Sequence, residues 1–266
     1  MNQRIDQVVE IDINCDMGES FGNYTLGRDA QVIGHITSAN VACGFHASDP
    51  LVMDRTVRLA LAHGVGVGAH PGYPDLRGFG RRRLDCSFEE IRTDLLYQVG
   101  ALHGLTKAAG GDLQHCKPHG ALYNTAAGDE GVARAVCQAL AQWDAGLILV
   151  TLAGPGGQVL RRVAAEEGLT RVAQEAFADR AYTPEGRLVP RNQAGAVIHD
   201  PRVVAARCLR MAREGVVEAS DGSLVPLNPH TICVHGDTPT AVELVAAIHQ
   251  ELAAGGVAVK PLGRII

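Results

Sequence analysis

Histidine residues stand at or near the ends of four short apolar runs in this chain. They are His46, His70, His119 and His235, and a fifth run, residues 9–16, ends in carboxylates instead. Imidazole can transfer a proton near neutral pH, and both imidazole and carboxylate groups can bind metal ions. One buried histidine is usually a structural residue, but polar side chains at the ends of several separate strands favour a shared site in a barrel enzyme.

The alternation of side chains along a strand indicates which of these residues share a face. Within residues 9–16, Asp12, Asn14 and Asp16 fall on one face. Three polar side chains are costly to bury unless they bind a ligand or one another, so a binding site and a hydrogen-bonded network are both open. The same alternation pairs Lys117 with His119, Glu175 with Asp179, His235 with Asp237, and His70 with Gly66 and Gly68, two glycines that leave room in the barrel centre.

Three cysteines stand two or three residues before a histidine, and such pairs are typical of zinc sites. The alternation, however, places Cys15, Cys43 and Cys116 on outward faces, and only Cys233 shares the face of His235. Free cysteine is also a common small core residue. The pattern therefore disfavours a metal site built on cysteine.

Metal ions and anions both have candidate ligands here, although no specific motif marks either site. Asp16, His46 and His70 suit several divalent ions, but no H-x-H or H-E-x-x-H spacing is present, so a metal requirement stays open. The glycine-rich residues 154–157 could bind an anion at a helix start or simply form a tight turn. The arginine-rich residues 77–83 could bind phosphate or carboxylate or lie in solvent.

Extended runs alternate with helical patterns along the chain, which is typical of β/α units. We expect helices at about 48–63 with Ser48 as its cap, 87–109 with a capping box, 129–142, 156–167, 200–214 and 239–254. Strands are expected at the five runs above and at about 146–152, 171–177, and 257–260. This pattern predicts one domain over residues 1–266, an α/β fold with a closed or partly closed (β/α) barrel of seven or eight mostly parallel strands.

Composition excludes several classes of partner. The 266 residues include 24 Lys+Arg and 29 Asp+Glu, so the net charge of -5 gives no electrostatic basis for binding nucleic acid. No apolar run reaches the roughly 18 residues of a membrane span, and the first residues lack the apolar stretch of a signal peptide. Seven dispersed cysteines without C-x-x-C pairs favour free thiols and a cytoplasmic location.

Several long segments together resemble the LamB/YcsF family. They are DINCDMGESFG at 12–22, SANVACGFHASDP at 38–50, GAHPGYPDLRGFGRR at 68–82, KPHGALYN at 117–124, EAFADR at 175–180 and VHGD at 234–237. The similarity runs from about residue 9 to 263, and motifs of this length are highly specific. The resemblance implies a distorted barrel similar to that of the polysaccharide deacetylases, in agreement with the pattern of elements.

The resemblance also implies an activity and partners. It implies cleavage of 5-oxo-L-proline, a cyclic amide, to L-glutamate, with ATP consumed as a co-substrate and hydrolysed to ADP and phosphate. It further implies that the chain is the A subunit of a 5-oxoprolinase and works with subunits B and C. Which of the three binds ATP stays open.

On this basis we predict which residues form the site. Asp16, with His46 or His70, is expected to position and deprotonate the nucleophile, and Lys117 and His119 to stabilise negative charge or protonate the leaving nitrogen. The catalytic set is Asp16, His46, His70, Lys117, His119 and His235. The substrate-binding set is Asp12, Asn14, Glu19, Glu175 for the ring N–H, Arg180 for the carboxylate, and Asp237.

Two other functions are compatible with the residues. One is a metal-dependent deacetylase or amidase that acts alone, by analogy of fold. The other is a non-catalytic subunit that binds 5-oxoproline and delivers it to its partners.

Overall fold

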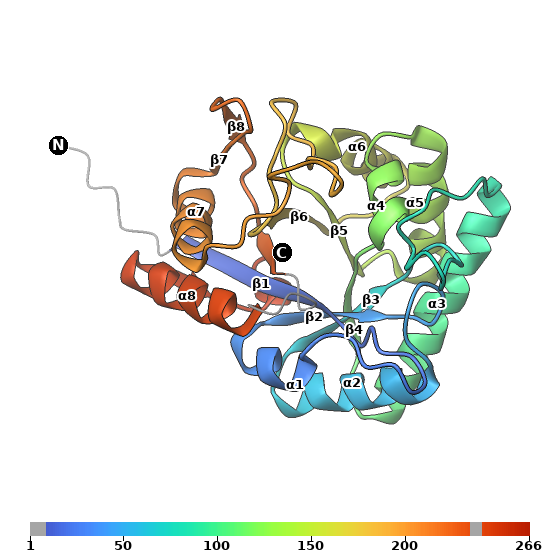
Figure 1. Cartoon of the computed structure of the whole chain (residues 1–266). Helices are drawn as coiled ribbons and strands as arrows, with labels where there is room; N and C mark the ends of the chain where they lie inside the picture. Colours follow the sequence, from blue (N-terminus) through green and yellow to red (C-terminus); the bar gives the residue numbers. More distant parts are fainter. Residues whose placement is uncertain (1–8, 235–240) are drawn as a thin grey trace.

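Seven parallel strands form a closed barrel in the computed structural model, which describes residues 9–234 and 241–266 (Figure 1). In order around the barrel they are β1 (Val9–Met17), β2 (Ser38–Ala42), β3 (Gly66–His70), β4 (Leu113–Cys116), β5 (Ile148–Leu152), β6 (Val172–Phe177) and β9 (Thr231–Val234). Pairing of β9 with β1 closes the ring. All seven strands therefore point their carboxyl ends at the same mouth.

An eighth strand, β10 (Val257–Val259), shares one edge of β1 with β9. It pairs with Val9, Glu10 and Ile11, whereas β9 pairs with β1 from Asp12 onward. A short antiparallel hairpin, β7 (Val216–Glu218) and β8 (Leu224–Pro226), forms a separate two-stranded sheet. The prediction of a barrel with seven or eight mostly parallel strands is confirmed.

Helices surround the barrel and cover its apolar outer face (Figure 1). The six expected helices are present as α2 (Pro50–Ala62), α3 (Phe88–Ala108), α5 (Glu130–Asp144), α6 (Gln158–Glu166), α7 (Pro201–Glu214) and α8 (Ala241–Ala254). Two short helices, α1 (Asp29–Val32) and α4 (Gly120–Ala126), were not predicted. Three 3₁₀ turns, Ile33–His35, Pro155–Gly157 and Leu262–Arg264, complete the elements.

The start of α2 differs from the prediction by one residue. Asp49, not Ser48, caps the helix, and its carboxylate accepts hydrogen bonds from the backbone N–H groups of Leu51 and Val52. Ser48 instead has a φ of 77°, which turns the chain just before the cap. The predicted capping box at Ser87 and Glu90 is confirmed at the start of α3.

Apolar side chains fill the end of the barrel at which the strands begin. Ile148, Val150, Ala173 and Leu262 form a small buried cluster there, separate from the large core beneath the helices. Polar residues occupy the interior above this cluster, towards the mouth. Among the described residues, no helix is long and apolar enough to cross a membrane.

Candidate functional site

The carboxylate of Asp12 is buried deep in the barrel, where three hydroxyl groups of the protein bind it. Thr37 and Ser38 each donate a hydrogen bond of 2.7 Å to one oxygen, and Thr231 donates one of 2.6 Å to the other. Asn14 in turn donates to the Thr231 hydroxyl at 2.6 Å. Burial raises the pKa of Asp12 to about 6, although these hydrogen bonds oppose the shift. Asp12 therefore anchors a buried network.

Asn40 carries this network towards the mouth. Its side-chain N–H groups donate to Asn14 at 2.7 Å and to Oδ1 of Asp16 at 2.8 Å, while its oxygen accepts from Nε2 of His115 at 2.7 Å. The ring of His115 fills the space beside Gly68, where a Cβ atom would lie 2.1 Å from Nε2. Gly68 leaves room in the barrel as expected, and the imidazole of His115 occupies that room.

Lys117 links two carboxylates at the bottom of the mouth. Its ammonium Nζ lies 2.8 Å from Oδ1 of Asp16 and 2.8 Å from Oε1 of Glu175. Tyr123 donates a hydrogen bond of 2.8 Å to the other oxygen of Glu175. Burial alone would lower the pKa of Lys117, but nearby negative charge, that of Asp16 foremost, holds it well above the usual range. Lys117 is therefore a buried cation at neutral pH.

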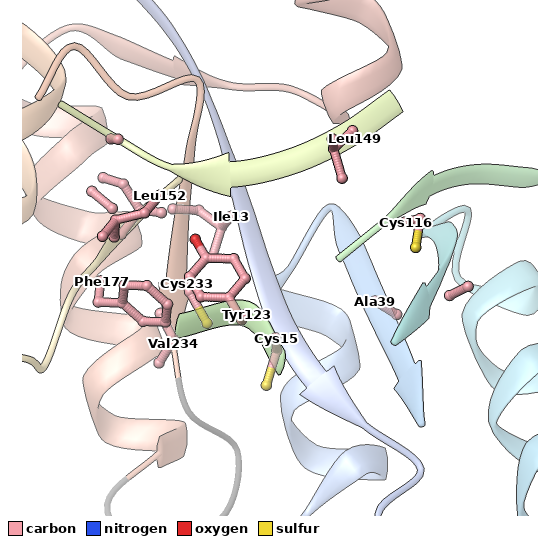
Figure 2. Close-up of a cluster of buried hydrophobic side chains, with 14 of the residues drawn as sticks. Ile13, Cys15, Ala39, Cys116, Tyr123, Leu149, Leu152, Phe177, Cys233 and Val234 are labelled. Atoms are coloured by element: carbon pink, nitrogen blue, oxygen red, sulfur yellow. The ribbon is translucent and has the colours of Figure 1, made fainter. Parts of the chain in front are cut away.

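Apolar and weakly polar groups surround this ammonium. Nζ of Lys117 lies 5.3 Å from the ring centre of Phe177, and the rings of Tyr123 and Phe177 meet edge to face at 6.1 Å (Figure 2). Sγ of Cys233 lies 3.2 Å from Nζ of Lys117, which confirms the predicted inward orientation of Cys233. Burial raises the pKa of this thiol far above the ordinary value. Charge interactions are strengthened in such surroundings because little water is present to screen them.

Two histidines beside Lys117 have orientations fixed by backbone carbonyls. Nδ1 of His70 lies 2.7 Å from the carbonyl oxygen of Lys117, and Nε2 of His119 lies 2.9 Å from that of Phe79. Since a carbonyl oxygen only accepts, both of these nitrogens carry hydrogen. The remaining ring nitrogens, Nε2 of His70 and Nδ1 of His119, face each other at 2.9 Å.

His46 completes a group of three imidazoles with Glu19 beside it. The ring of His46 stacks on that of His119 with centres 3.7 Å apart and planes 4° from parallel. Burial, and then the neighbouring His119 and His70, hold the pKa of His46 well below its usual range, so the ring is neutral. Potential ligand atoms of Glu19, His46, His70 and His119 all lie within 4.8 Å of one another, so these four residues could hold a metal ion.

Two glycines press their backbone against these rings. A Cβ atom on Gly72 would lie 2.8 Å from Nδ1 of His46. One on Gly80, whose φ is 62°, would lie 2.7 Å from Cβ of His46 and 2.8 Å from Cδ2 of His119. Both positions lie in the loop after β3, so this loop locks the stacked rings in place.

A cavity of about 450 Å³ lies above the lysine and the histidines. Its volume falls in the range of small-molecule sites, roughly 300–1,000 Å³. The acidic, basic and imidazole groups on its walls are Asp16, Glu19, His70, Lys117, His119, Arg81, Arg180, Arg187 and Arg191. Acidic and basic groups thus meet at its base, and its remaining wall combines four arginines with apolar side chains.

The arginines of the predicted anion-binding loop have different partners. Arg81 lines the cavity, while Arg82 pairs with the buried Asp75 and Arg83 pairs with Asp129 at 3.1 Å. The pair of Arg82 and Asp75 lowers the pKa of that carboxyl and fixes the loop. Arg81 is therefore the member of residues 77–83 placed to meet a ligand.

Arg180 lines the cavity and also secures the segment that covers it. Its Nη2 donates to the carbonyl of Val189 at 2.6 Å, and its Nε donates to that of Ala196 at 3.3 Å. Gly156, in the predicted glycine-rich turn, lines the same cavity, and Gly154 there has a φ of 67°. Residues 154–157 form a tight turn between β5 and α6.

The structure brings most of the predicted site residues together and separates others. Asp12 and Asn14 lie deeper in the barrel, so a substrate contact by either stays a prediction. His235 and Asp237 lie outside the described residues, and their roles also stay predictions. The predicted residues at or next to the cavity are Asp16, Glu19, His46, His70, Lys117, His119, Glu175 and Arg180.

Sequence reasoning missed four residues of the site. Arg187 and Arg191 lie in the irregular segment 178–199, where no periodic pattern assigns a direction to a side chain. Tyr123 and Phe177 read as ordinary core aromatics in the sequence. The short spacing of Tyr123 from Lys117 and His119 in the same motif was the available signal.

Comparisons with known proteins agree with the fold and the motifs. The profile of the LamB/YcsF family matches residues 11–266. The A subunit of a 5-oxoprolinase from Natranaerobius thermophilus is 55% identical over 95% of this chain and 97% of its own, and that from Pyrococcus furiosus is 54% identical over 97% and 100%. The crystal structure of a lactam utilization protein from Thermus thermophilus, 48% identical, superposes with a TM-score of 0.89 and covers 95% of this chain and 99% of its own.

Proposed function

The chain belongs to the LamB/YcsF family, and we propose that it is the A subunit of an ATP-dependent 5-oxoprolinase that opens 5-oxo-L-proline to L-glutamate. The observation that carries the proposal is the buried ion-paired Lys117 at the base of a cavity with arginines on its wall. The names of the relatives, the A subunit of 5-oxoprolinase in two of them and a lactam utilization protein in the third, support it.

The cavity suits a small anionic lactam. The carboxylate of 5-oxoproline pairs with the arginines of the wall, of which Arg81 and Arg180 come from the loops after β3 and β6. The ring N–H then donates to Glu175 or Asp16, and the lactam oxygen lies towards Nζ of Lys117. The cavity exceeds the lactam in size, which leaves room for a second group such as a transferable phosphate.

ATP enters the scheme because the lactam amide is unstrained and stabilised by resonance. Transfer of the terminal phosphate to the amide oxygen makes the ring carbon a better electrophile and releases ADP. Water adds to that carbon, the C–N bond breaks as the nitrogen takes up a proton, and glutamyl phosphate forms. A second water then releases phosphate and leaves glutamate.

The roles of the side chains follow from their positions. Asp16 lies between Lys117 and His70, at 2.8 Å and 3.4 Å, and accepts the proton of the attacking water. Lys117 stabilises the negative charge that develops on oxygen, in surroundings that contain little water to screen it. In this scheme subunits B and C complete the enzyme and contribute to the handling of ATP.

One experiment tests the proposal against its alternatives. Glutamate release from 5-oxoproline is measured with the purified chain alone and with subunits B and C, each with and without ATP. The proposal expects glutamate only with ATP and all three subunits, and at least a 100-fold loss for Lys117→Met, as for loss of one oxyanion donor. Unchanged turnover with Lys117→Met but weaker binding of 5-oxoproline identifies a non-catalytic binding subunit, which overturns the catalytic assignment.

The group of Glu19, His46, His70 and His119 favours a second candidate, a metal-dependent amidase that acts alone. Turnover of a cyclic amide by the isolated chain without ATP, lost on treatment with a chelator, would establish it. The same assay therefore separates the two enzymes.

A further inference from the structure

We propose that Glu19, His46, His70 and His119 form a binding site for one divalent transition-metal ion. The four residues come from four separate segments: the loop after β1, the loop after β2, the end of β3 and the residue that precedes α4. They converge because the carboxyl ends of these neighbouring strands meet at one side of the barrel mouth.

The hydrogen positions on two of the rings are the first argument. His70 and His119 each use one nitrogen to donate to a backbone carbonyl, of Lys117 and Phe79. When both rings are neutral, the other nitrogens carry lone pairs, and these two atoms are 2.9 Å apart. Two lone pairs at this distance repel unless a cation or a shared proton lies at their meeting point. A metal ion bound to both nitrogens removes this repulsion.

The second argument is independent and comes from His46. The side chain is fully buried, and within the described part of the chain neither of its ring nitrogens has a hydrogen-bond partner. A buried polar atom without a partner is destabilising, and each such atom in a native protein requires an explanation. Nε2 of His46 lies 4.0 Å from Oε1 of Glu19, on the side where the proposed ion binds.

The spacing of the four donors is compatible with one ion. With bonds of about 2.1 Å, opposite ligands of an octahedral ion are about 4.2 Å apart, so donors that lie within 4.8 Å of one another need to close by at most about 0.6 Å. Rotation of the carboxylate of Glu19 supplies a shift of this size. The rings of His70 and His119 are already oriented by carbonyl hydrogen bonds, as metal-binding histidines usually are. The ring of His46, which lies against Gly72 and stacks parallel on that of His119, tilts to direct a nitrogen at the same ion.

The ligand set indicates the class of ion. Three imidazoles and one carboxylate favour zinc, iron, cobalt or nickel over magnesium and calcium, which prefer oxygen ligands. Glu19, His70 and His119 line the cavity, so the ion faces it and can keep a position for water or substrate. Asp16 is then left as the proton acceptor beside the ion, 3.4 Å from Nε2 of His70.

The site rests on geometry and not on the proposed 5-oxoprolinase activity. Binding of metal without any turnover of 5-oxoproline would keep the site and remove the proposed function. Turnover of 5-oxoproline by a protein that binds no metal would keep the proposed function and remove the site.

Metal binding to the untagged full-length chain tests the proposal. The chain is stripped with a chelator, loaded with Zn²⁺ or Co²⁺, passed over a desalting column and measured by mass spectrometry of the metal and by calorimetry. We expect one equivalent per chain and no binding of Mg²⁺ under the same conditions. Failure to retain either transition metal at a stoichiometric level overturns the proposal.

Variants assign the ion to these residues. His46→Gln and His119→Gln are expected to weaken binding of Co²⁺ at least 100-fold, whereas His63→Gln, an exposed histidine at the end of α2, leaves it unchanged. Equal affinity in all three variants overturns the assignment. If the buried variants fail to fold, X-ray absorption of the zinc-loaded wild-type chain decides, because imidazole ligands give a distinct outer-shell signal. A spectrum without that signal also overturns it.

Discussion

Lys117 and Glu175 form a buried ion pair, 2.8 Å long, across the interior of the barrel. Loss of one partner leaves the other as an unpaired buried charge, so Lys117→Met is expected to lower the free energy of unfolding by about 3–5 kcal/mol. Lys117→Met combined with Glu175→Gln is expected to be less destabilising than the two single changes added together. Urea unfolding of all three variants measures this coupling.

A surface pair provides the control for this prediction. Lys107 and Asp112 also form an ion pair, but both side chains are more than half exposed. Lys107→Met is expected to change stability very little, because water screens such pairs. Equal losses for Lys107→Met and Lys117→Met would contradict a special role for the buried pair.

Arg81 is expected to bind the substrate carboxylate, whereas Arg83 is not. Arg81 lines the cavity, and Arg83 pairs with Asp129 outside it. A hydrogen bond to a charged group contributes about 1.5–3 kcal/mol, so Arg81→Met is expected to raise KM for 5-oxoproline roughly 10- to 100-fold. Steady-state kinetics of the complete enzyme give the measurement. A KM for Arg81→Met no higher than that for Arg83→Met would refute the contact.

The buried carboxyl of Asp12 is expected to make stability depend on pH. Its pKa is about 6 in the folded protein against 3.8 for an ordinary aspartate, so the folded state holds this proton more tightly than the unfolded chain. Its stabilising contribution is therefore present below about pH 4 and is lost as pH rises to about 6, a total of roughly 3 kcal/mol. Asp12→Asn is expected to remove this dependence.

Urea unfolding of wild type and Asp12→Asn at several pH values between about 3.5 and 7 measures the effect as a difference, which cancels the contribution of other groups. The wild type should lose stability relative to the variant as pH rises. A constant difference over that range would show that the carboxyl titrates alike in the folded and unfolded states.

Gly68 and Gly104 are expected to respond in opposite ways to the same substitution. A methyl group on Gly68 would overlap the ring of His115, whose Nε2 would lie 2.1 Å away, whereas one on Gly104 within α3 meets nothing within 4 Å. Gly68→Ala is expected to be destabilising by about 1–3 kcal/mol through overpacking, and Gly104→Ala to be stabilising by up to about 1 kcal/mol through helix propensity. The melting temperatures of Gly68→Ala and Gly104→Ala, each compared with that of the wild type, measure these opposite effects. Similar melting temperatures would mean that His115 moves aside freely.

The periodic part of the fold could be predicted from the sequence, and the irregular part could not. Strand alternation correctly separated the inward Cys233 from the outward Cys116, which lies near Cys137 of α5. It placed Gly68 on an inward face but did not predict that the ring of His115 fills the space beside it, because the bulge between Val67 and Gly68 and the position of that ring both depend on the adjacent strand β4. Pairing across strands is a tertiary property that one strand's own pattern does not contain.

The histidines illustrate the same limit within the site. His70 ends a strand and could be placed by alternation, but His46 reaches the group through a loop that includes Gly44 with a φ of 93° and Ser48 with a φ of 77°. Which nitrogens of His70 and His119 carry hydrogen depends on the carbonyls of Lys117 and Phe79. Lys117 is distant from His70 in the sequence, and Phe79 is distant from His119 and lies in a turn. The sequence therefore predicted which histidines belong to the site better than it predicted which of their nitrogens carry hydrogen.

Leu262 and its apolar neighbours close the end of the barrel at which the strands begin. As far as the described residues show, the cavity is thus a well and not a tunnel. A molecule formed beside Lys117 leaves by the route along which its precursor entered, and only after the occupant above it has gone. Depth in the well then dictates the order of release, and the group held beside Lys117 departs last.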